Sequence, residues 1–156
     1  MKTKEIDIKE VVKRDIENIK KEMIGIKNVV FELNSLIMEI PFIDKVDQNV
    51  KKKLVEKMRV IYANASEIFE EVNKMDRILG RKEVKDYVKQ LNVYLNALST
   101  LEYSTHQYFA AFLNKYVPDD DINSIYTYYV NVTQMIYSFT ENHKKIVGNL
   151  GEEYYV

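Results

Sequence analysis

Apolar residues recur at alternating spacings of four and three along this sequence, and no other feature constrains the fold as much. The first such stripe comprises Ile19, Met23, Ile26, Val30, Leu33, Ile37 and Ile40. Since an α-helix has about 3.6 residues per turn, this spacing places the side chains on one face of a helix, as in coiled coils. The second and third stripes include Ile68 and Leu95, both of which we expect in the core. The fourth runs from Ile122 to Leu150.

Helix-breaking residues divide the stripes into four segments of similar length. Pro41 disfavours helical geometry in the residue before it, Gly80 stands where a helix commonly ends, and Pro118 precedes an acidic start of the last segment. We expect Asp44 to cap the second helix. The predicted helices span about 5–40, 45–79, 82–117 and 120–149, followed by a C-terminal tail at 151–156.

The predicted fold is all-α, an antiparallel up-down-up-down four-helix bundle formed by one domain of residues 1–156. The connections are too short to cross a bundle about 50 Å long, so helices that follow each other in sequence must run in opposite directions. A hydrophobic fraction of 46% and a charged fraction of 30% are typical of globular domains. Bundles of this kind serve many functions, so function has to be argued from particular residues.

The sequence lacks the residues that most catalytic and metal sites need. The sequence has no cysteine, which excludes disulfides, thiolate metal sites and cysteine nucleophiles. Di-metal bundles require two Glu-x-x-His pairs, and neither Glu102 with His106 nor Glu141 with His143 has that spacing. We therefore expect no metal, no cofactor and no enzymatic activity.

A carboxylate pattern flanks Gly80. Glu67-x-x-Glu70 followed by Glu83-x-x-Asp86 superficially resembles the metal-binding signature of all-α nucleotide pyrophosphohydrolases of the MazG type. If the neighbouring stripe residues face the core, however, all four carboxylates point outward. We interpret them as solvated surface.

His143 is the one strongly polar member of the fourth stripe. Folding the chain at its turns places it level with Ser66 and Tyr94, either of which could hydrogen-bond the imidazole, and one turn away from Met23. A Met and a His from the first and last helices form the axial pair of b-type bundle cytochromes. Haem or another ligand bound by His143 and Met23 is therefore one alternative to a purely structural histidine. Glu102 is a polar residue within the third stripe, and folding the chain at its turns places it level with Lys57. We therefore predict a pair between these two side chains, which would fix helix register.

Charge is distributed unevenly along the chain. Residues 1–90 hold 20 Lys/Arg against 17 Asp/Glu, whereas residues 91–156 hold 3 against 7, and no residue between Asp121 and Glu141 is charged. The 120–149 segment carries a second apolar and aromatic face, which is typical of a protein contact. Its members are Tyr126, Tyr128, Val130, Met135 and Tyr137. We expect Tyr128 and Tyr137 to be anchors that lie off the core.

The sequence thus favours a non-enzymatic protein-interaction or assembly module that acts through its last two helices. It would be a homo-oligomer, a scaffold or virion-type subunit, or an adaptor or inhibitor, with protein as partner, self or heterologous. The alternative is a small nucleic-acid-binding subunit, because basic residues gather early in the second helix. These are Lys51, Lys52, Lys53, Lys57 and Arg59. Without a recognisable signal peptide or membrane span, we expect a cytoplasmic location.

Overall fold

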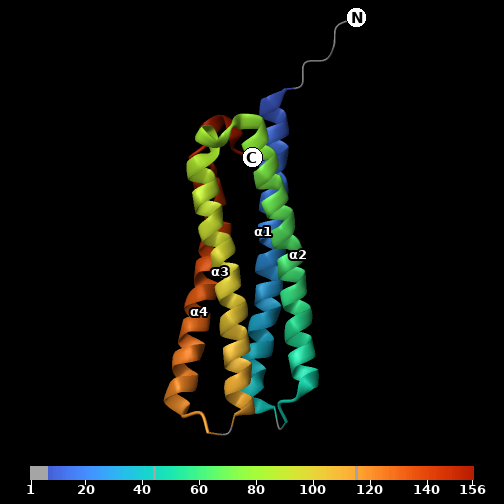
Figure 1. The fold of residues 1–156 in the computed structure, drawn as a ribbon, viewed down its shortest axis with the longest axis vertical. Coiled ribbons are helices and arrows are strands. Elements are labelled where there is room, and N and C mark those ends of the chain that lie inside the picture. The colour runs from blue at the N-terminus through green and yellow to red at the C-terminus, as the bar shows by residue number, and fades with distance from the viewer. Residues whose placement is uncertain (1–6, 44, 115) are drawn as a thin grey trace, which may run out of the picture.

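The chain is an all-α, antiparallel four-helix bundle in a computed structural model that describes residues 7–43, 45–114 and 116–156 (Figure 1). The long helices are α1 (Ile8–Glu39), α2 (Gln48–Leu79), α3 (Arg81–Leu113) and α4 (Asp119–Glu141). The short ones are η1 (Ile40–Phe42), α5 (His143–Val147) and η2 (Glu152–Tyr154). Figure 1 shows that α1 and α3 run opposite to α2 and α4, which confirms the predicted up-down-up-down order.

The helix ends differ from the predicted ones where local capping decides them. Asp47 caps α2, since its carboxylate accepts a hydrogen bond of 3.0 Å from the backbone N–H of Asn49, whereas the predicted cap, Asp44, lies outside the described residues. Gly80 joins α2 to α3 with φ 87° and ψ 150°, a backbone conformation that glycine adopts most easily. The third helix ends at Leu113 and not at the predicted residue 117, and Tyr116 beyond it is almost fully exposed.

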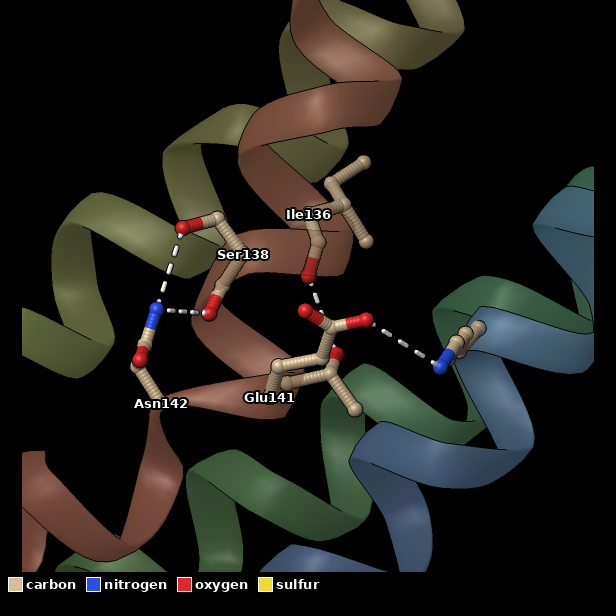
Figure 2. A network of polar contacts seen from close by, with 6 residues as sticks. Ile136, Ser138, Glu141 and Asn142 are labelled. Carbon is tan, nitrogen blue, oxygen red and sulfur yellow. Dashed lines mark hydrogen bonds and ion pairs between the residues drawn. The ribbon is translucent and has the colours of Figure 1, made fainter.

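The fourth helix is interrupted at Asn142, which the apolar spacing did not predict. The backbone of Asn142 has φ −97° and ψ 11°, and its side-chain amide donates to the carbonyl oxygen of Ser138 at 2.9 Å and to the Ser138 hydroxyl at 3.2 Å (Figure 2). This local hydrogen bonding offers the backbone an alternative to continued helix. The chain resumes as α5, in which His143 and Val147 are buried.

The core follows the predicted stripes closely. All seven predicted residues from Ile19 to Ile40, six in α1 and Ile40 in η1, are buried, and Ile68 in α2 is fully enclosed. The contact between α1 and α2 is close: a Cβ placed on Gly25 would lie 3.0 Å from the side-chain nitrogen of Asn64. Leu95 in α3 is only half-buried, so the stripe overstates its burial.

The C-terminal tail folds back on the bundle instead of extending away from it. It contains η2, which contacts α1, and its Tyr154 and Tyr155 rings pack against the core. The ammonium group of Lys144 lies 5.3 Å from the centre of the Tyr155 ring, within range of a cation–π interaction. Among the described residues, no helix combines the length and the apolar composition needed to span a membrane.

Candidate protein-binding groove

A groove runs along the contact between α1 and α4 and consists of three adjoining cavities. The first, of about 400 Å³, lies beside Phe31 and Tyr137. The second, of about 120 Å³, shares Tyr137 with the first and reaches Met38 and Tyr126. The third, of about 560 Å³, shares Met38 and Tyr126 with the second and extends to Phe42. Because each cavity shares side chains with the next, we treat them as one feature, the α1–α4 groove.

Large apolar side chains are exposed along one side of this groove. Phe31 and Met38 of α1 and Phe42 of η1 are 69%, 61% and 86% exposed, and all three line the groove. On α4, Tyr128 and Met135 are 49% and 44% exposed but line none of the three cavities. Phe31 and Met38 are seven residues apart, as are Tyr128 and Met135, so each pair lies on one face of its helix. The sequence analysis did not select the α1 residues, although their heptad spacing was visible beside the core stripe.

The five predicted interface residues divide into two groups. Tyr126, Val130 and Tyr137 are half-buried and pack against the core, with the Tyr126 ring 5.7 Å from that of Tyr108. Tyr128 and Met135 are the exposed pair. The prediction that Tyr137 lies off the core is therefore wrong. Tyr126, Val130 and Tyr137 line the α1–α4 groove, and Tyr126 also meets Tyr108 of α3, whereas Tyr128 and Met135 lie outside the groove.

Asn34 of α1 holds the two sides of the groove together. Its amide nitrogen donates to the Tyr137 hydroxyl at 2.8 Å, and its amide oxygen accepts from the Tyr129 hydroxyl at 2.5 Å. Burial raises the pKa of both tyrosines, so both hydroxyls stay protonated. The groove is consequently lined at its middle by neutral groups whose hydrogen bonds depend on one alignment of α1 against α4.

Charged lining residues occur only at the two ends of the α1–α4 groove. At one end the ammonium group of Lys27 lies 3.8 Å from a carboxylate oxygen of Glu141, the ion pair drawn in Figure 2. At the other end the lining includes Asp119 at the start of α4. A ligand that fills this groove therefore meets apolar and amide groups along most of its length.

His143 is buried and forms a hydrogen bond with a residue that the sequence analysis did not select. Its Nε2 lies 2.8 Å from the hydroxyl oxygen of Tyr87, whereas Ser66 is exposed, so the predicted partners Ser66 and Tyr94 are wrong. Burial and the nearby Lys20 lower the pKa of His143 to about 4. Met23 is fully buried in the core. Since Tyr87 occupies the imidazole nitrogen that would bind iron, this geometry is that of a neutral structural histidine.

The predicted pair between Glu102 and Lys57 does not form. The Lys57 ammonium group lies 2.6 Å from a carboxylate oxygen of Glu32 on α1. Glu102 instead accepts a hydrogen bond from the Tyr62 hydroxyl, and its other oxygen lies 3.7 Å from Nε2 of His106. Lys57 and Glu102 each contact a nearer residue. Two side chains on different helices can pair only if they lie at the same level along the bundle and also face each other.

The lysine cluster of α2 is spread around the helix. Lys51, Lys52, Lys53 and Arg59 are exposed, and Lys57 is half-exposed and paired with Glu32. Successive residues differ by about 100° in direction, so the three consecutive lysines do not form one stripe.

Carboxylates on either side of Gly80 face solvent, as predicted: Glu67, Glu70, Glu83 and Asp86 are all exposed. In the part of the chain that the structure describes, no group of three or more His, Asp or Glu side chains is arranged to hold a metal ion.

A scan of protein-family models and searches of curated proteins and of solved structures gave no match to this chain.

Proposed function

We propose that this protein is an assembly module in which the α1–α4 groove packs against the same groove of a second copy of the chain. The observation that supports it most directly is the set of exposed apolar side chains around a groove with no charge at its middle. Contiguous exposed apolar surface of this kind is typical of protein contacts.

Two features favour a second copy as the partner. The heptad spacing of Phe31 and Met38, which both line the groove, suits helices that pack along their lengths. The groove also has unlike ends, since one carries Lys27 beside Glu141 and the other carries Asp119 at the start of α4. In a two-fold, antiparallel dimer, Asp119 of one copy lies opposite Lys27 of the other, which places opposite charges across the contact.

The test is the mass of the full chain in solution, measured by analytical ultracentrifugation over a range of concentrations. We expect a dimer that becomes a monomer when Phe31→Lys or Met38→Lys places a charge in the desolvated contact. Both side chains are largely exposed in the monomer, so circular dichroism should show unchanged helicity.

A matched control is Phe69→Lys, because Phe69 is 55% exposed and lies on α2, away from the α1–α4 groove. This variant should remain a dimer. A wild-type chain that is monomeric at every concentration would overturn the proposal, as would a dimer that dissociates equally with Phe69→Lys.

A further inference from the structure

A second groove lies on the opposite side of the bundle, between α2 and α3. It has a volume of about 590 Å³. Its apolar lining is formed by valines: Val72 and Val84 are buried at the base, Val88 is half-buried, and Val93 is exposed at the edge. We call this feature the α2–α3 groove. Since α1 and α4 contribute nothing to its lining, it can be occupied independently of the α1–α4 groove.

One edge of the α2–α3 groove is basic. Arg81, Lys85 and Lys89 all line it from α3, and because they are spaced four residues apart they follow one another along the same face of the helix. None of the three forms an ion pair with any carboxylate in the described segments. The opposite edge, from α2, carries Asn73 and one carboxylate, Asp76.

We propose that the α2–α3 groove binds an acidic amphipathic helix of a partner protein. The valine lining suits the apolar face of such a helix, and the three cations suit Asp or Glu residues placed four apart on its flank. The lining extends from Arg81 to Asn96, which is about 22 Å of helix at 1.5 Å per residue. This length accommodates about four turns of a bound helix.

Charge complementarity decides among occupants. A duplex nucleic acid or a flat anionic membrane would contact the exposed ammonium groups but leave the recessed valines in water. An acidic helix uses both the cations and the apolar lining, and burial of apolar surface supplies most of the binding free energy in such contacts.

The probe for this proposal is a fluorescently labelled synthetic peptide of about 18 residues, with leucines at heptad positions and glutamates along one flank. Its binding to the full-length chain is measured by fluorescence anisotropy. A matched peptide with lysines in place of the glutamates and vesicles of anionic phospholipid serve as competing ligands. We expect saturable binding of the glutamate peptide alone, weakened by added salt.

Variants of the exposed edge locate the binding. Lys85→Glu combined with Lys89→Glu should weaken affinity for the glutamate peptide by about tenfold or more, because two attractive contacts become repulsive. Val93→Glu should weaken it as well, since a charge then enters the apolar edge. The matched control, Lys51→Glu with Lys52→Glu, introduces the same charges on α2 outside the groove and should leave affinity unchanged.

Circular dichroism checks that each variant keeps the helicity of the wild type. The proposal is overturned if the glutamate peptide does not bind saturably, if the lysine peptide binds equally well, or if the Lys85 and Lys89 variant binds like the wild type. Binding to vesicles without binding to the peptide would identify a membrane surface instead, and would also overturn it. The outcome is separate from the dimer test, because neither variant alters the α1–α4 groove.

Discussion

At the scale of single residues, the most unusual environment belongs to two carboxyl groups between α1 and α2. Asp15 and Glu71 are both buried, and each has one oxygen without a hydrogen-bond partner in the described structure. The other oxygen of Glu71 lies 3.2 Å from the ammonium group of Lys74. Burial, together with the hydrogen bond and the negative charge of Glu71, raises the pKa of Asp15 to about 6. A proton on Asp15 allows this carboxyl to donate a hydrogen bond to Glu71.

This proton links stability to pH. Because the pKa of Asp15 rises from 3.8 in the unfolded chain to about 6 in the folded one, the folded state holds the proton more tightly. The resulting stabilisation is complete below the unfolded pKa and is lost as pH rises through 6. We expect Asp15→Asn to raise the free energy of unfolding above pH 6 by about 1–2 kcal/mol, relative to the wild type at the same pH.

Urea denaturation at several pH values between about 4 and about 7 measures the effect. His143 contributes with the opposite sign, since its lowered pKa makes the folded state lose stability as pH falls from 6.5 toward 4. Subtracting the free energy of unfolding of Asp15→Asn from that of the wild type at each pH removes the contribution of His143, because both proteins contain it. Asp86→Asn, at an exposed carboxylate, is the control. Parallel curves for wild type and Asp15→Asn would contradict the prediction.

The spacing in the sequence contained the signal for this pair. Asp15 is three residues after Val12 and four before Ile19, and Glu71 is three after Ile68. Each carboxylate therefore stands one residue before a buried stripe position, Ile16 or Val72, and the sequence analysis passed both over because it followed apolar residues only. Their proximity across α1 and α2 could not be predicted, since it depends on how far one helix slides along the other.

At the scale of helices, their number, direction and core faces could be predicted, whereas several ends and side-chain pairs could not. The alternating spacing fixes a face because it depends only on helical geometry. An end depends on a single local hydrogen bond, such as the one from Asn142 to Ser138 that interrupts α4. Side-chain pairs such as Glu32 with Lys57 depend on the rotation of two helices at once.

The rotation of α2 also determines what its lysines can bind. Lys51, Lys52 and Lys53 point in three directions, and Lys57 is already paired with Glu32. We therefore expect that replacing the three consecutive lysines with alanine does not change the binding of mixed duplex DNA or RNA at low ionic strength. Fluorescence anisotropy with labelled nucleic acid checks this. Binding that weakens steeply with salt and disappears in the triple variant would restore the nucleic-acid function.

At the scale of the whole molecule, the bundle is two closed hairpins with more open sides between them. α1 packs more extensively on α2 than on α4, and α3 packs more extensively on α4 than on α2, so the two grooves lie where the hairpins meet. Periodicity identifies which face of each helix turns inward but contains no information on how far apart two helices settle. For this reason the core was predictable and the grooves were not.

This unequal packing predicts unequal costs for two substitutions that the stripes treat alike. Ile68→Ala should reduce the free energy of unfolding by about 2–5 kcal/mol, because Ile68 is fully buried and its loss leaves a cavity. Leu95→Ala should cost about 1 kcal/mol, because Leu95 is half-buried and lines an opening between α2 and α3 that water already reaches. Urea denaturation with equal m-values for both variants gives the comparison. Equal losses would mean that Leu95 is as enclosed as Ile68, and hence that α2 and α3 close on each other in solution.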